Sequence, residues 1–140
     1  MTPYVLIHDG ARPCITQKII TDSIDAVKIY SACTVGVPVK DTIKIVDEDQ
    51  MGVDTPDRSR LWQVQTPQSF NRGLLLTCYD RLAYDKCQVI TDDTMIVERY
   101  SSVRTKVIMG AYENLKITTP EDLKIASNFL KKDVDTKMVK

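Results

Sequence analysis

The sequence predicts a single α/β domain in which helices are layered against a β-sheet. Short apolar segments rich in β-forming residues alternate with longer segments whose apolar residues recur at helical spacing. That alternation is typical of α/β layer structures. The chain has 140 residues, which suffices for one such domain with a modest core.

Composition narrows the function classes. Lys and Arg together number 19, as do Asp and Glu, so the net charge is zero and nucleic acid is not an expected partner. No apolar run could span a bilayer and no signal-peptide pattern is present, so we expect no membrane partner and a cytoplasmic location. The four cysteines form no Cys-x-x-Cys pair. Reduced cytosolic thiols are therefore the simplest expectation.

The first strand should span residues 4–7, an apolar run suited to burial on both faces. Gly10 and Pro13 then interrupt regular structure, which places Asp9 and Arg12 at the carboxyl end of the strand, where open α/β sheets bind ligands. Asp9 could hold Mg²⁺, and Arg12 could grip a phosphate. The alternative is an Asp that caps a turn beside a solvated Arg.

A helix should follow, with Thr16 as its cap. Its apolar positions at helical spacing are Ile19, Ile20, Ile24 and Val27. The small and β-branched residues of 33–39 predict the next strand. The two strands and the intervening helix should form a parallel βαβ unit.

Residues 41–66 should form an arm. Residues 42–46 and 61–65 alternate in polarity around a charged, turn-like cluster, which predicts a two-stranded ribbon that ends at Pro67. Such a ribbon is marginal alone, and Trp62 on it would need a partner surface. A flexible surface loop is the alternative.

The remaining chain continues the alternation of helices and strands. Asn71 should cap a helix with one apolar side, formed by Leu74, Leu75, Cys78, Tyr79 and Leu82. Another helix start is indicated by Thr91, Asp92 and Asp93. Strands are expected at 103–109 and 115–118.

The last helix should open at Thr119–Asp122, with Pro120 in its first turn. Leu123, Ala126 and Leu130 should form its buried stripe, with Phe129 alongside. We expect the domain to end at residue 131, followed by a frayed, charged tail over 132–140.

Several polar groups should converge on one edge of the sheet. Besides Asp9 and Arg12 they are Lys40, Asp41, Thr42, Arg58, Thr66 and Lys116. Cations and hydroxyls together suit a phosphorylated substrate, and a carboxylate among them suits a metal-bound nucleotide.

Each of these residues also has a simpler interpretation. Lys40 could protect a strand edge, and Lys116 could extend along an apolar surface to reach solvent. Asp92 and Asp93 are better explained as a helix cap than as metal ligands. His8, the sole histidine, is expected to be packed or bonded within its loop rather than to transfer protons.

Six ordered motifs carry a resemblance to a known family. They are His-Asp-Gly-Ala-Arg-Pro (8–13), Val-Pro-Val-Lys-Asp-Thr-Ile-Lys (37–44), Asp-Arg-Ser-Arg-Leu-Trp (57–62), Gln-Thr-Pro-Gln-Ser-Phe (65–70), Thr-Asp-Asp (91–93) and Glu-Asn-Leu-Lys-Ile-Thr-Thr-Pro-Glu-Asp-Leu (113–123). Together they resemble the carboxyl-terminal portion of the 2-C-methyl-D-erythritol 4-phosphate cytidylyltransferases.

The resemblance implies a three-layer α/β/α nucleotidyltransferase fold, Rossmann-like and similar to nucleotide-diphospho-sugar transferases, with a projecting β-arm. It implies a transferase of isoprene biosynthesis, in which the phosphate of the polyol phosphate attacks the α-phosphorus of CTP and pyrophosphate leaves. That chemistry depends on positioning and charge neutralisation and needs no protein nucleophile. The family also implies a homodimer formed through the 41–66 arm.

The resemblance assigns roles residue by residue. Asp9 matches the ligand of Mg²⁺, or another divalent cation, and with Gly10 and Ala11 faces the nucleotide. Residues matching those that hold the methylerythritol phosphate are Arg12, Thr42, Arg58, Thr66 and Lys116. Of these, Arg58 and Lys116 are the expected catalytic residues, with Arg58 reaching the neighbouring subunit's site.

The family's Gly-rich loop, which cradles the CTP triphosphate, has no counterpart here. The glycines stand at positions 10, 36, 52, 73 and 110, never close together, whereas such a cradle needs successive backbone N–H groups aimed at phosphate. We therefore expect an amino-terminally truncated enzyme, inactive alone, whose exposed sheet edge is covered by another chain or poorly ordered.

Two other functions remain open on the sequence. Ribitol-5-phosphate cytidylyltransferase shares the fold and the Gln-Thr-Pro-Gln-Ser-Phe type of motif, although residues 40–44 and 114–118 favour methylerythritol phosphate. A non-catalytic, dimerising fragment with a vestigial site is the second alternative.

Overall fold

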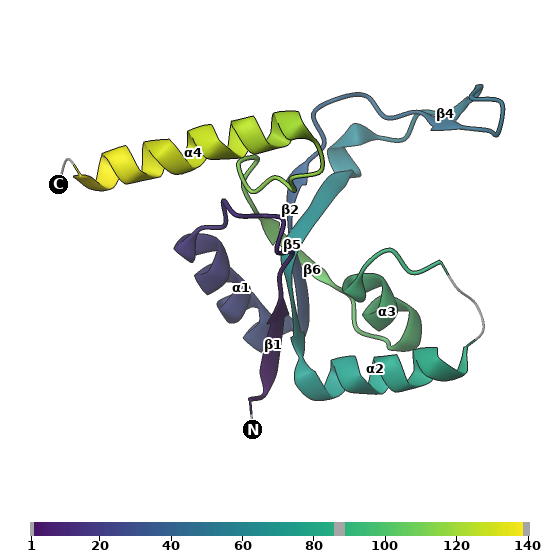
Figure 1. Ribbon diagram of the computed structural model, residues 1–140. Helices are drawn as coiled ribbons and strands as arrows, with labels where there is room; N and C mark the ends of the chain where they lie inside the picture. Colours follow the sequence, from purple (N-terminus) through teal and green to yellow (C-terminus); the bar gives the residue numbers. More distant parts are fainter. Residues whose placement is uncertain (1, 86–88, 139–140) are drawn as a thin grey trace.

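The structure, a computed structural model, describes residues 2–85 and 89–138. Its main sheet has the strand order β1-β5-β2-β6 and consists of β1 (Tyr4–Ile7), β5 (Trp62–Asn71), β2 (Ala32–Pro38) and β6 (Lys106–Met109). Helix α1 (Gln17–Tyr30) covers one face, and α2 (Arg72–Tyr84) with α3 (Asp93–Tyr100) covers the other (Figure 1). The three-layer α/β/α prediction is thus confirmed.

The expected parallel βαβ unit is modified by an inserted strand. Strand β5 pairs antiparallel with both β1 and β2, so β1 and β2 run in the same direction without touching. Strand β2 pairs in parallel with β6 on its other side. Consecutive strands are usually neighbours, and the sequence gives no sign that a later segment separates these two.

The core lies on both faces of β2. Ala32 packs with Phe70, Leu75 and Val97 on the α2–α3 face, while the next residue, Cys33, packs with Ala26 and Val27 of α1. Successive strand residues point to opposite faces, so one buried strand supplies both layers. This explains its continuous run of small and β-branched residues.

The expected helix caps are largely confirmed. Thr16, Asn71 and Asp92 each accept a hydrogen bond from the backbone N–H three residues ahead. At the start of α4 (Pro120–Met138), the Thr119 hydroxyl accepts from Asp122 N and the Asp122 carboxylate accepts from Thr119 N. These bonds satisfy amide donors that a helix start leaves unpaired.

Helix α4 corrects two expectations. Of the predicted buried stripe only Ala126 is buried, whereas Leu123 is 57% and Leu130 40% exposed, because the helix starts at one end of the sheet and extends away from it rather than along a face (Figure 1). The helix continues to Met138, so residues 132–138 are helical rather than a frayed tail.

The arm projects from the body as expected (Figure 1), but its pairing was predicted wrongly. Strand β3 (Ile45–Val46) pairs with β4 (Gly52–Asp54), and the turn between them is held by the Asp47 carboxylate, which accepts from two backbone N–H groups. Residues 61–65, the expected second strand, lie mostly in β5. A one-turn 3-10 helix, η1 (Arg58–Arg60), precedes it.

Two other strand predictions need correction. The strand expected at 103–109 begins only at Lys106, and residues 115–118 are a loop. That segment makes one ladder-like bond, from Ile117 N to Ala11 O at 2.9 Å. It was predicted as a strand because its residues alternate in polarity, but it has no neighbouring strand with which to extend the pairing.

Other expectations concern cysteines and membranes. Cys14, Cys33 and Cys78 are buried and form no disulfide within the described chain, while Cys87 lies outside the described residues. In the described chain no helix is both long and apolar enough to cross a membrane.

Gly110 is required by close packing. A Cβ there would lie 2.5 Å from both the Gln65 Oε1 and the Val35 Cγ1 atoms, whereas a Cβ on Gly52 would meet nothing within 4 Å. We predict that Gly110→Ala lowers the free energy of unfolding by about 1–3 kcal/mol through overpacking, and that Gly52→Ala changes it far less. Urea denaturation of both variants tests this, and equal midpoints would contradict it.

Candidate functional site

The site begins with an irregularity in β5. The β2–β5 register passes from Thr34↔Gln68 to Gly36↔Val64, so three residues of β5, 65–67, lie opposite Val35. Such a bulge interrupts the ladder and redirects side chains. It also accommodates Pro67, which has no N–H to pair. The strand therefore continues through a proline that was expected to end it.

The bulge aims Thr66 at the loop after β1. The Thr66 hydroxyl accepts a hydrogen bond from Asp9 N at 2.9 Å and lies 2.9 Å from His8 Nδ1. His8 Nε2 lies 3.0 Å from the Arg12 carbonyl oxygen. Because that carbonyl only accepts, a neutral imidazole carries its hydrogen on Nε2, and the Thr66 hydroxyl then donates to Nδ1. The expectation of a loop-bonded His8 is confirmed.

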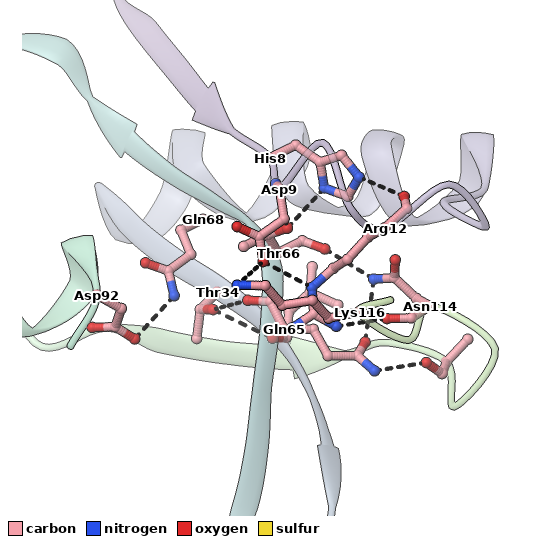
Figure 2. Close-up of polar contacts among 12 residues, drawn as sticks. His8, Asp9, Arg12, Thr34, Gln65, Thr66, Gln68, Asp92, Asn114 and Lys116 are labelled. Carbon is pink, nitrogen blue, oxygen red and sulfur yellow. Dashed lines mark hydrogen bonds and ion pairs between the residues drawn. The ribbon is translucent and has the colours of Figure 1, made fainter. Parts of the chain in front are cut away.

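Three charged side chains meet beside this loop (Figure 2). Asp9 Oδ2 lies 3.2 Å from Arg12 Nε and 3.5 Å from Lys116 Nζ. The Arg12 side chain is 11% exposed, that of Asp9 32% and that of Lys116 49%. The cluster carries one net positive charge on a surface open to ligands, which suits a phosphate.

Arg12 retains donors for a ligand. Its Nε donates to Asp9 and its NH1 group donates to the Asn114 carbonyl at 2.8 Å. Within the described chain, three of its five N–H groups have no hydrogen-bond partner. A guanidinium held on one side and open on the other is arranged for planar recognition of phosphate.

These groups open onto a cavity of about 490 Å³. It is lined by Ile7, Asp9, Arg12, Val64, Gln65, Thr66, Gln68, Thr91, Asp92, Asp93 and Lys116. A volume of this size suits a small ligand. Its two cations and Asp9 come from the β1 loop and the 110–118 loop, whereas Thr91, Asp92 and Asp93 come from the start of α3.

Gln68 holds the α3 side of the cavity in place. Its Nε2 donates to Asp92 Oδ2 at 3.0 Å and its Oε1 accepts from Thr94 N at 3.2 Å. Asp92 Oδ1 caps the helix by accepting from Met95 N. Asp92 is therefore the expected cap and also forms part of the cavity wall.

Asp93 accepts a hydrogen bond from the Tyr79 hydroxyl. This bond, together with partial burial and the negative charge of Asp93, raises the pKa of Tyr79 to about 12. The tyrosine therefore stays neutral, and its hydroxyl ties α2 to the edge of the cavity.

The structure brings together four of the predicted site residues: Asp9, Arg12, Thr66 and Lys116. It does not bring Thr42 or Arg58 to them within one chain. Thr42 lies exposed at the base of the arm, and Arg58 donates to the Lys40 carbonyl at 2.7 Å.

The other two residues of the β1 loop take structural positions. Gly10 is exposed, with room for a side chain, so nothing in its packing requires glycine. Ala11 contributes its carbonyl to the bond with Ile117 N. That bond fixes the loop carrying Lys116 against the loop carrying Asp9.

Sequence reasoning missed three buried amide side chains: Gln65, Gln68 and Asn114. No sequence signal marks them, because amide side chains also occur on exposed surfaces. Thr91 was interpreted only as part of a helix start, and it also lines the cavity.

A divalent cation fits this site with one protein ligand. Asp9 lines the cavity, and no group within the described residues bonds to its Oδ1. No cluster of three or more His, Cys, Asp or Glu side chains occurs in that part of the chain. Mg²⁺ commonly takes one or two carboxylates and completes its shell with substrate phosphates and water.

Comparison with known proteins gives the family. The family model described as 2-C-methyl-D-erythritol 4-phosphate cytidylyltransferase matches residues 2–132. The chain belongs to this family. A cytidylyltransferase of that name from Lachnospira eligens is 50% identical over 129 residues, and one from Caldanaerobacter subterraneus subsp. tengcongensis is 51% identical over 128.

Solved structures give the fold independently. The 4-diphosphocytidyl-2C-methyl-D-erythritol synthase of Anaerococcus prevotii matches with a TM-score of 0.85 at 34% identity, covering 93% of this chain and 59% of that one. The cytidylyltransferase of Thermus thermophilus matches with a TM-score of 0.82 at 27% identity, covering 94% and 63%. The predicted nucleotidyltransferase fold is thereby confirmed.

The matches cover only part of each relative's sequence. They cover 91% of this chain but 57% of the Lachnospira protein and 56% of the Caldanaerobacter protein. The chain thus spans a little over half the length of these cytidylyltransferases.

The Thr66 hydroxyl offers a test of how the β1 loop is held. Thr66→Val keeps the β-branched shape but leaves Asp9 N and His8 Nδ1 without their partner, so we predict a loss of about 1–3 kcal/mol in unfolding free energy. Thr77→Val, which removes an exposed hydroxyl bonded to Gly73 O in α2, is the matched control and should change stability by less than about 0.5 kcal/mol. Equal denaturation midpoints would refute this role.

Proposed function

We propose that this chain supplies the polyol-phosphate side of a cytidylyltransferase site. The reaction transfers a cytidylyl group from CTP to 2-C-methyl-D-erythritol 4-phosphate and releases pyrophosphate, in the cytoplasm and as a step of isoprenoid biosynthesis. The observation that carries the proposal is the Asp9–Arg12–Lys116 cluster at the mouth of the cavity, in a chain of this family.

The charges of the cavity orient the substrate. The phosphate binds at the Arg12 and Lys116 end, where it meets cations with unpaired donors. The polyol hydroxyls lie toward the α3 end, where Asp92 and Asp93 offer carboxylate acceptors. A phosphate at the opposite end would face these two carboxylates, and none of the described residues that line that end is a cation.

Asp9 would hold the divalent cation through Oδ1. A bound Mg²⁺ would neutralise part of the triphosphate charge. Arg12 and Lys116 would keep the attacking phosphate beside it, because both already contact Oδ2 of the same carboxylate. The chain's own contribution is thus positioning and charge neutralisation.

The triphosphate cradle must come from elsewhere. Gly10 stands alone in the loop after β1, Gly36 and Gly52 lie in strands, Gly73 lies in α2, and Gly110 is packed against Gln65. None of them stands in a loop of successive N–H donors of the kind that binds phosphates. We therefore infer that this chain alone binds the polyol phosphate but does not turn over CTP.

Calorimetric titration tests the binding. We predict that 2-C-methyl-D-erythritol 4-phosphate binds this chain and that Lys116→Ala weakens the affinity by roughly 10–100-fold, since it removes a charge-assisted contact. Lys124→Ala, at an exposed position of α4, is the control. Pyrophosphate release from CTP should be undetectable.

The outcomes separate the competing functions. Tighter binding of ribitol 5-phosphate would favour the ribitol enzyme. Binding of neither polyol phosphate would leave a non-catalytic fragment, and turnover near that of an ordinary enzyme would show that a cradle exists here.

We further propose that the arm joins two subunits. It projects into solvent with exposed apolar side chains at Ile43, Ile45, Val46, Met51 and Val53, and a monomer rarely leaves such a patch uncovered. A two-fold dimer is the commonest arrangement. In it, Arg58 and Thr42 would reach the partner's cavity, which accounts for their distance from the cluster within one chain.

Sedimentation tests the dimer. Replacing Ile45 and Val53 with Lys should give monomers, because it places two charges in the apolar interface. Ile29→Lys, at an exposed position of α1, should leave the assembly unchanged. A dimer that survives the double substitution would rule out the arm as the contact.

A further inference from the structure

We propose that Asn114 is a positioning residue, which sets Arg12 and the loop carrying Lys116 for capture of the phosphate. The inference rests on the proposed function above and deepens it. Asn114 touches no ligand, because its side chain is fully buried behind the cavity wall. It acts through the two cations that line the cavity.

The Asn114 side chain fixes its loop to the bulge of β5. Its Nδ2 group donates to the Thr66 carbonyl at 2.9 Å and to Gln65 Oε1 at 3.3 Å (Figure 2). Both hydrogens of the amide are therefore used. Thr66 is also the residue that binds the β1 loop, so a single bulge positions both loops of the site.

The Asn114 main chain then positions the guanidinium. Its carbonyl accepts from Arg12 NH1 at 2.8 Å, while Arg12 Nε donates to Asp9 Oδ2. Two residues further on, Lys116 faces the same carboxylate at 3.5 Å. Any shift of the Asn114 backbone would therefore move the acceptor of Arg12 and the origin of Lys116 together.

The surroundings specify an asparagine at this position. Gln65 Nε2 donates to the Ala111 carbonyl at 2.8 Å, which turns Gln65 Oε1 toward Asn114. Gly110 leaves the space that Gln65 occupies. Two acceptors thus face position 114, and a side chain of this size must present two donors. An aspartate of the same shape would place a carboxylate oxygen against these two acceptor oxygens.

Stability alone accounts poorly for this residue. Within the described part of the chain, Asn114 Oδ1 is buried with no hydrogen-bond partner, and leaving such an atom unpaired is destabilising. An unpaired buried atom in a native structure calls for an explanation. Here the amide is retained because its two donors and its carbonyl join the bulge to Arg12.

The test uses this whole chain and two readouts. The first is the guanidinium N–H signals of Arg12 in a ¹H–¹⁵N spectrum, above all that of the NH1 group, which donates to the Asn114 carbonyl. The second is calorimetric affinity for 2-C-methyl-D-erythritol 4-phosphate. The variants are Asn114→Ala and the milder Asn114→Ser, which serves if the first does not fold. Asn128→Ala, at an exposed position of α4, is the control.

In the wild-type chain we expect the Arg12 signal to be shifted and its proton to exchange slowly with solvent. In the folded Asn114 variant we expect the signal to coincide with those of exposed arginines. Affinity for the polyol phosphate should fall at least tenfold, with no change for Asn128→Ala. A variant that melts earlier but keeps the Arg12 signal and the affinity would overturn the proposal.

Failure of the proposed function is distinguishable from failure of this inference. If the wild-type chain binds no polyol phosphate, the proposed substrate is wrong. The Arg12 signal still decides the positioning role in that case: its loss in the Asn114 variant supports the role, and its persistence refutes it.

Discussion

The bulge at residues 65–67 of β5 is the constraint on which the site depends. A regular strand would alternate its side chains between the two faces of the sheet. The bulge instead directs the Thr66 hydroxyl to the loop after β1, and the Thr66 carbonyl and the Gln65 amide to Asn114. One short segment in the middle of the sheet therefore holds both loops that carry cations.

Local patterns in the sequence predicted the elements that depend on local chemistry. The caps at Thr16, Asn71 and Asp92 follow from side chains that bond their own helix starts. Strand pairing depends instead on distant segments. The polarity of residues 61–65 alternates, as it would in a strand of either a ribbon or a sheet. Nothing in their local sequence therefore indicates that they pair with β2 rather than with the arm.

The same distinction applies to the site. Asp9 and Arg12 were predictable, because polar residues directly after a buried strand lie at the ligand edge of the sheet. The positions of Lys116 and Thr66 at the same edge were also expected, whereas their roles followed only from the ordered motifs of a family. The sequence did not predict the roles of Asn114, Gln65 and Gln68. What a buried amide contributes depends on the hydrogen-bond partners that the tertiary structure brings to it. Within the single chain, Arg58 and Thr42 lie apart from the cluster.

The topology also bears on the order in which the molecule is built. Strand β1 precedes its neighbour β5 by some 60 positions, and the Arg12–Asn114 bond spans 102 positions. Contacts so distant in sequence are costly in loop entropy and form slowly. During synthesis, the corner formed by Asp9, Arg12 and Lys116 therefore stays incomplete until residues 114–116 have been made, by which time helices α1, α2 and α3 already exist.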